Sequence, residues 1–320
     1  MKKRFLGILL AVAMLLTLTC GSALAAYPEK PIELYVGYAA GGASDISARL
    51  LAPYLEKYLG QAVAVVNLPG GGGEIAYTEL ANAKPDGYLL AFVNAPATIS
   101  IPLAREANYT LDDFAYIGNA IYHENLIVVR PDGDIQSLED LLELAKSKPG
   151  EVTMGNSGPF ADDHLASLAF QDAAGIELND TAFSGTAPSL VALLGGHIDA
   201  VVCNVADVVG KMDQVKVIAT MGAEANPLFD APTLVSKGYN TVMGNYTTLG
   251  APAETPEEVL TILRDAMEKA CNDPEYIEKA TAANLPIVYL NAEEVTKAYQ
   301  ESRTLLEELW VKLDLSSEAE

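Results

Sequence analysis

Two glycine-rich turns carry the clearest chemical signal in this sequence. One spans Gly41 to Asp45 and the other spans Pro69 to Gly73, and each follows a short apolar run and opens an amphipathic stretch. Glycine lets backbone N–H groups approach a ligand closely, and the first-turn N–H groups of a helix, with its dipole, favour negative charge. Two such turns side by side therefore predict an anion cradle built from the main chain.

Weaker patterns point to other chemistry. The stretch Gly71 to Ala76 matches the dinucleotide fingerprint G-x-G-x-x-A. The acid that would bond the ribose would be Asp86, which lies somewhat closer in sequence to the glycines than this fingerprint usually has it. The motif around Ser157, Gly155 to Pro159, lacks the final glycine of the nucleophile elbow of hydrolases. No histidine and acid that could complete a catalytic triad with Ser157 are evident in the sequence. We expect no catalytic residue, with an exported hydrolase as an alternative function.

The run Asp162, Asp163 and His164 contains metal-ligating residue types. Adjacent residues on a helix diverge in direction, so this run is more typical of acids that cap a helix beside a packed histidine. The other histidines, His123 and His197, stand apart in the sequence. We therefore expect no bound metal.

The first 25 residues predict export. Basic residues 2–4 precede an apolar run from Phe5 to Leu18 and the small-residue pattern Ala23 to Ala25, after which cleavage is expected. A lipidated Cys20 is the rival processing site. Export places the protein in the periplasm or another extracytoplasmic space, away from the cofactor pool that a nucleotide site needs, so we expect no cofactor.

Charge and cysteine content narrow the partners. The chain has 43 acidic and 20 basic residues, a formal net charge of −23, which argues against nucleic acid as a partner. Acidity on this scale favours solubility, and an anion site must then rely on local dipoles and hydrogen bonds. Cys203 and Cys271 stand in buried patterns; export permits a disulfide, but two buried thiols are the expected state.

Strands and helices alternate along the chain, which predicts α/β layers with parallel sheet. Strands are expected at 32–38, 62–67, 88–94, 126–130, 152–156, 181–183, 198–203, 215–220 and 247–249, and helices at 45–58, 74–83, 138–146, 162–174, 187–194 and after Pro256 and Asn291. A chain of 320 residues exceeds the usual single-domain size. We expect a first domain from residues 26–123 and 248–320, a second from 124–247, and crossings near 114–127 and 243–250 that form a hinge. The last residues, 316–320, are expected to be a frayed acidic tail.

An ordered set of short motifs runs through most of the chain. They are residues 27–32 (Tyr-Pro-Glu-Lys-Pro-Ile), Gly41-Gly42 with Asp45 and Arg49, 59–61, 67–70, 84–88, 155–158, His164-Leu165, 183–188, 194–199 and Pro232-Thr233. In order and spacing they resemble the tripartite tricarboxylate transporter solute receptors, called the Bug family. Each motif alone is weak, but the ordered set is specific.

The resemblance implies a two-lobed venus-flytrap receptor of the type II periplasmic-binding-protein kind, with two doubly wound α/β domains and a two-segment hinge. Such a receptor is a monomer that closes on a small carboxylate and delivers it to integral-membrane transporter subunits, without catalysis. A sensor subunit for a membrane signalling kinase is the alternative that the receptor sequence does not separate.

The resemblance also assigns the ligand site. In the family, one ligand carboxylate is held by the two glycine turns of the first lobe, partly through waters, and the second lobe selects the rest of the molecule. By position the first lobe supplies Tyr38, Gly41, Gly42, Ala43, Ser44, Asp45, Gly72, Gly73 and Glu74, and the second supplies Ser157, Phe160, Ala161, Asp162, Asp163, Ser184, Gly185, Thr186 and Ala187. Both turns of the second lobe lie at carboxyl ends of predicted strands, where open α/β sheets bind ligands.

Three departures from the family pattern concern charge. Glu74 and Ala76 replace a neutral polar residue and a glycine, Ser184 stands where a basic residue is frequent, and residues 160–163 add acids. Such a pocket suits a citrate-like trianion poorly. We expect an amino acid or another zwitterion whose amine pairs with Asp162, Asp163 or Glu74; the alternative is that these acids sit in first helical turns and point to water.

Overall fold

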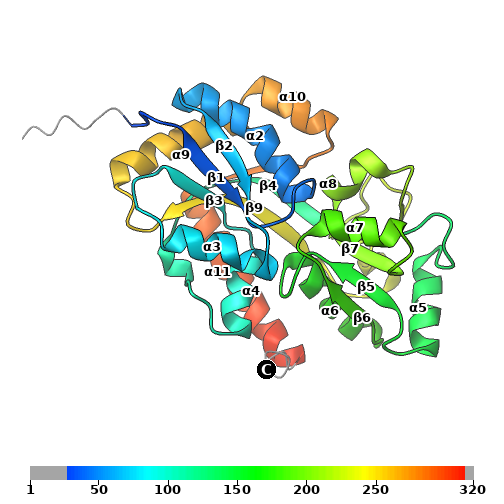
Figure 1. Ribbon diagram of the computed structural model, residues 1–320. Coiled ribbons are helices and arrows are strands. Elements are labelled where there is room, and N and C mark those ends of the chain that lie inside the picture. Colours follow the sequence, from blue (N-terminus) through cyan, green and yellow to red (C-terminus); the bar gives the residue numbers. More distant parts are fainter. Residues whose placement is uncertain (1–26, 314–320) are drawn as a thin grey trace, which may run out of the picture.

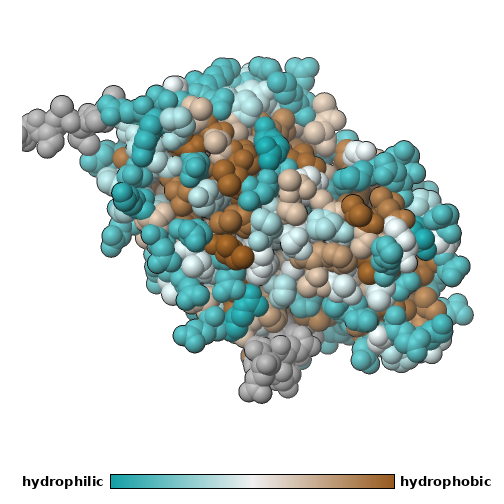
Figure 2. Space-filling view, in the orientation of Figure 1, coloured by the Kyte–Doolittle hydropathy of each residue, from teal (hydrophilic) through white to brown (hydrophobic). Residues whose placement is uncertain are grey.

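The computed structural model describes residues 27–313, which form two α/β lobes (Figure 1). The expected export signal, the lipidation site and the expected tail at 316–320 lie outside the described residues. Within the described part no helix combines the length and the apolar character that a bilayer span requires. Hydrophilic residues cover much of the face shown in Figure 2, consistent with the acidic composition.

The first lobe is built on three parallel strands that lie in the order β2-β1-β3. These strands are β1 (Ile32–Val36), β2 (Val63–Asn67) and β3 (Leu89–Phe92). One face packs on α2 (Ala43–Leu59), α9 (Glu257–Cys271) and α10 (Pro274–Ala282), and the other on α3 (Glu74–Ala81), α4 (Ala97–Ala104) and α11 (Ala292–Leu313). A strand buried on both faces explains the continuous apolar runs in the sequence.

The second lobe repeats this layering. Its parallel strands are β5 (Thr153–Asn156), β6 (Asn179–Ala182) and β7 (Ala200–Asn204), with β8 (Lys216–Thr220) antiparallel to β4. One core joins α5 (Leu138–Ser147) and α6 (Asp162–Ala174), and another joins α7 (Thr186–Leu194) and α8 (Val205–Val208). Short 3₁₀ turns lie at Gly71–Gly73, Leu111–Asp113, Val209–Lys211 and Val235–Lys237.

Two paired strands connect the lobes. β4 (Phe114–Val129) runs through both, and β9 (Gly244–Pro252) pairs with it antiparallel from Phe114 opposite Pro252 to Glu124 opposite Gly244. The strands of both lobes thereby join one ten-stranded sheet, to which β10 (Ile287–Asn291) adds an edge on β4. The two-segment hinge is confirmed, whereas the exact domain boundaries stay a prediction.

The sequence analysis is wrong on three points of this architecture. The sheet is mixed, because β4, β8, β9 and β10 run antiparallel to their neighbours. Helix α4 was missed because it is apolar on all sides and buried, so it has no amphipathic period. The sequence analysis also missed helices α8 and α10, strand β10 and the first half of β4.

The two cysteines of the described residues, Cys203 and Cys271, are free and buried, as expected.

Candidate functional site

The two lobes are closed on each other along a polar cleft. The cavity that remains between them measures about 10 Å³, close to the space of one water molecule. Its lining residues come from both lobes and from β9; they are Tyr38, Gly42, Ala43, Ser44, Ser157, Asp162, Thr186, Asn204 and Asn245. A ligand larger than water therefore enters only when the lobes separate.

Glycines allow the two backbones to meet. A Cβ on Gly72 would lie 2.4 Å from the carbonyl oxygen of Pro159, and a Cβ on Gly185 would lie 2.7 Å from the nitrogen of Ala39. The amide of Ala39 donates to the carbonyl of Ser184 at 3.1 Å across the cleft. Gly72 and Gly185 thus permit the close approach of the two lobes, and the anion cradle at the turns of Gly41 and Gly73 stays a prediction.

The first glycine turn leads into α2, whose N-terminus faces the cleft. The Gly41 amide donates to the Asp45 carboxylate at 2.8 Å, and the Ala43 amide donates at 2.6 Å to Asp207 of the second lobe. No hydrogen bond within the described residues uses the amides of Ser44 and Asp45. The Ser44 hydroxyl accepts from Asn94 at 2.9 Å, which orients it in the cleft wall. This helix terminus can therefore bind an anion through the main chain.

The second turn is occupied by its own lobe. The Gly73 amide donates to the Gly70 carbonyl at 3.1 Å, and the Gly72 carbonyl accepts from the Tyr38 hydroxyl at 2.9 Å. Glu74 forms an ion pair with Arg105, with 2.6 Å between Oε2 and Nη2. In the closed structure the Gly73 amide is engaged within the turn, and the charge of Glu74 is balanced by a base that the sequence analysis did not consider.

Two buried carboxylates form the wall of the second lobe. Asp162 accepts from the side-chain amides of Asn125 at 2.8 Å and Asn204 at 2.9 Å, and Asp163 accepts from the Ser157 amide at 2.7 Å and hydroxyl at 2.8 Å. Burial raises the pKa of Asp162. Burial and the neighbouring Asp162 raise the pKa of Asp163. Of the two, only Asp162 lines the remaining cavity.

The other predicted residues of the second lobe surround this wall. Ser184 and Gly185 form the turn against Ala39, Thr186 lines the cavity, and a Cβ on Gly41 would lie 3.8 Å from Ala187. Phe160 and Ala161 are buried at the start of α6, where Ser100 of the first lobe donates to the Phe160 carbonyl at 2.5 Å. The structure thus brings most of the predicted set to one interface, and their part in ligand binding stays a prediction.

Four residues of this interface were absent from the predicted set: Asn125, Asn204, Asp207 and Asn245. Asn204 and Asp207 follow the predicted strand at 198–203, so the rule that ligands bind at carboxyl ends of strands pointed to them. Asn125 and Asn245 lie on β4 and β9, and nothing in the sequence pattern distinguishes polar hinge residues from those of an exposed strand.

Metal and hydrolase chemistry find little support at this site. No group of three or more metal-ligating side chains occurs in residues 27–313. His164 accepts from the Phe160 amide at 3.0 Å, and the Ser157 hydroxyl is bonded to Asp163, not to a histidine. His164 thus bonds at the start of α6. The expectation that Asp162 and Asp163 cap this helix is wrong, because α6 has no side-chain cap and both acids bond to polar groups of the cleft wall.

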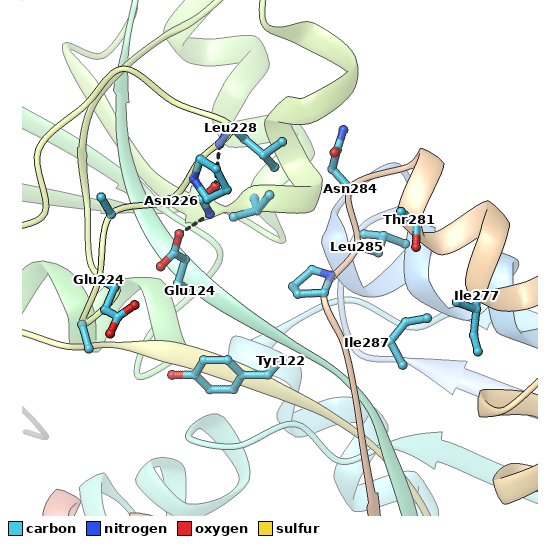
Figure 3. Close-up of a pocket in the computed structure, with 15 residues that line it drawn as sticks. Tyr122, Glu124, Glu224, Asn226, Leu228, Ile277, Thr281, Asn284, Leu285 and Ile287 are labelled. Carbon is cyan, nitrogen blue, oxygen red and sulfur yellow. Dashed lines mark hydrogen bonds between the residues drawn. The ribbon is translucent and has the colours of Figure 1, made fainter.

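A much larger pocket lies on the opposite face of the hinge. It measures about 730 Å³ and lies between residues 277–287 of the first lobe and 223–228 of the second, with Tyr122 and Glu124 from β4 (Figure 3). Glu124 accepts from Asn226, and burial raises its pKa. The lining contains no basic side chain, so this pocket is a poor site for a carboxylate despite its size.

Two α/β lobes that close across paired hinge strands, with helix N-termini turned to the cleft, define the class of two-lobed solute-binding receptors. Residues 47–314 match the family described as tripartite tricarboxylate transporter family receptor. The chain belongs to this family, the Bug family of solute receptors, as its ordered motifs predicted. The description of the family is that of a transporter receptor.

Individual relatives agree with this assignment. A Cupriavidus necator protein, the UPF0065 protein in the gbd 5' region, is 31% identical over 275 residues, covering 84% of this chain and 83% of the relative. Protein BugT of Bordetella pertussis is 29% identical and covers 80% of this chain and 81% of BugT. The periplasmic binding protein BugD has the same fold, with a TM-score of 0.84 and 28% identity over 90% of this chain and 99% of BugD.

Proposed function

We propose that this protein is an extracytoplasmic solute receptor that binds a small carboxylate-containing ligand between its lobes and delivers it to a tripartite tricarboxylate-type transporter. The main support is the N-terminus of α2, where Ala43 and Ser44 line the polar interlobe cavity and no hydrogen bond among the described residues uses the amides of Ser44 and Asp45. Amides at a helix N-terminus hold a carboxylate without a buried base. Family membership supports the delivery step and the extracytoplasmic location.

The charges of the cleft favour a ligand that also carries an amine. No lysine, arginine or histidine lines the remaining cavity, whereas Asp162 does and is buried. A buried carboxylate without a cationic partner is costly, and a ligand ammonium beside it relieves that cost. An amino acid or another zwitterion therefore fits the cleft, with its carboxylate at α2 and its amine at Asp162.

Binding measurements on the purified protein test this proposal. Isothermal titration with amino acids, malate, adipate and citrate is expected to show the tightest binding for a zwitterion. Asp162→Asn is expected to weaken that binding at least about tenfold, because a charged hydrogen bond is lost. Asp180→Asn is the matched control, since Asp180 is a largely buried carboxylate of the same lobe that bonds to Gln171 outside the cleft.

Two results would contradict the proposal at different levels. Tight binding of citrate with no binding of amino acids rejects the zwitterion and keeps the receptor. Binding of no carboxylate by a folded protein rejects the carboxylate receptor itself. Delivery is tested with membranes that contain the transporter, where labelled ligand is expected to accumulate only when this protein is added.

A further inference from the structure

Asp207 reaches from the second lobe into the anion-binding position of the first. It lies in α8, is 1% exposed, and accepts from the Ala43 amide with 2.6 Å between nitrogen and Oδ1. Ala43 is the first residue of α2, the helix whose N-terminus faces the cleft. The chain therefore places one of its own carboxylates where a helix N-terminus attracts an anion.

Contacts within the second lobe orient the carboxylate of Asp207. Its other oxygen accepts from the Asn204 amide at 2.9 Å, in a capping box in which the Asn204 side chain caps the same turn. The side chain therefore needs little rearrangement to reach Ala43. A bond of 2.6 Å to a charged acceptor belongs to the short, strong class of hydrogen bonds.

We propose that Asp207 is a specificity-determining residue that occupies part of the α2 terminus in the closed receptor and so limits the ligand to a single carboxylate. This inference rests on the proposed function. Asp207 takes the Ala43 amide and leaves those of Ser44 and Asp45 for one ligand carboxylate. A second ligand carboxylate would face Asp162 and Asp207 in a cleft whose remaining cavity no basic side chain lines.

The contact between Asp207 and Ala43 is tested without any ligand. Hydrogen exchange of the Ala43 amide, followed by NMR, is expected to be at least about tenfold faster in Asp207→Ala than in the wild type, since the amide loses its acceptor. Asp113→Asn is the matched control, because Asp113 closes a capping box with Thr110 away from the cleft. Equal exchange in Asp207→Ala and the wild type would overturn the contact.

The selectivity is tested with Asp207→Asn, which keeps the shape of the side chain and removes its charge. Isothermal titration is expected to show adipate or malate binding about tenfold tighter than to the wild type, with zwitterion binding changed less than about threefold. An unchanged ratio of the two affinities would overturn the selectivity. If the wild type binds neither class, the proposed function fails, while the exchange of Ala43 still decides whether Asp207 occupies α2.

Discussion

The two faces of strand β4 border regions of opposite character. On one face His123 and Asn125 meet Ser47 and Asp162 in a cleft that is closed to about 10 Å³. On the other face Tyr122 and Glu124 line an open pocket of about 730 Å³. Alternate residues of one strand point to opposite faces, so a single strand of the hinge serves both regions.

This difference shows that the size of a hollow does not identify the ligand site. Neither lining contains a basic side chain, but the large pocket has mostly apolar walls, whereas the small cavity combines Asp162 with side-chain amides, hydroxyls and helix N-termini. We expect the two regions to respond oppositely to opening, because lobes that rotate about β4 and β9 and separate on the cleft side would approach each other on the hinge side. Substitutions that favour or prevent closure of the lobes therefore test whether the cleft, and not the large pocket, is the ligand site.

The largest effect is expected from Gly72→Ala. The added Cβ would lie 2.4 Å from the Pro159 carbonyl oxygen, and Gly72 has a φ of 73°, which strains an L residue. The strain lowers stability whether the lobes are open or closed, whereas the clash with Pro159 opposes the closed state alone. We therefore expect ligand affinity to fall by at least about a hundredfold. Isothermal titration measures the affinity, and small-angle scattering measures whether the lobes still close.

Gly60→Ala is the control for strain alone. Gly60 has a similar φ of 71°, but no atom lies within 4 Å of an added Cβ. It is expected to lower stability by about 1 kcal/mol and to leave ligand affinity unchanged. Equal affinities for Gly72→Ala and the wild type would mean that contact between Gly72 and Pro159 is not required for closure.

Much of the cleft was predictable from local signals. Helix α6 was predicted with its observed bounds, and the turns at Gly41 and Gly185 were predicted to face the cleft, because strand, glycine turn and helix have recognisable periods. Contacts between lobes were not predictable in this way. The pairing of Asp207 with Ala43 joins residues 164 positions apart and depends on how far the lobes close.

The hinge-face pocket and the ion pair of Glu74 could not be predicted from the sequence either. Glu74 was expected as a partner for a ligand amine, yet Arg105 lies beside it because α4, a helix with no amphipathic period, ends there. The pocket is formed by segments 223–228 and 277–287, whose proximity follows only from the crossing of the lobes. Sequence periodicity describes single elements, and these features arise between elements.

The buried acids of the cleft face predict a pH dependence of stability. Burial raises the pKa of Asp207 to about 6, and its charged neighbours include Asp162 and Asp163 from α6 and Lys211 from the turn after α8. The folded protein then holds this proton more tightly than the unfolded chain, so the contribution to stability is full below about pH 4 and is lost as the pH rises through 6. We expect a loss on the order of 2 kcal/mol across this range.

Urea unfolding from pH 4 to 7 measures this loss. Asp207→Asn is expected to reduce it by the share of Asp207, while Asp162 and Asp163, whose pKa values burial also raises, retain theirs. Glu124→Gln is the comparison on the hinge face, where the raised pKa of a half-buried carboxylate is expected to contribute less. The free energy of unfolding would depend less on pH in Glu124→Gln than in Asp207→Asn if the hinge face, and not the cleft face, were the main source of the pH dependence. That result would contradict the prediction.

Filling the hinge-face pocket is expected to have a smaller and opposite effect. A bulky side chain in Ala223→Trp would occupy space that must shrink when the lobes open, so the closed state is favoured. We expect ligand release to slow about threefold, as stopped-flow fluorescence would measure. Ile262→Trp, an exposed position on α9, is the control. Faster release from Ala223→Trp would show that opening does not compress this pocket.

The smallest effect is expected at the end of α11, where Lys312 forms an ion pair with Asp172 of the second lobe at 2.5 Å. The Lys312 side chain is 65% exposed, and exposed ion pairs contribute little because water and salt screen them. Lys312→Ala is therefore expected to change ligand affinity less than about threefold, and less still at high salt. A larger change in isothermal titration would mean that closure depends on this outer contact as well as on the glycine contacts of the cleft.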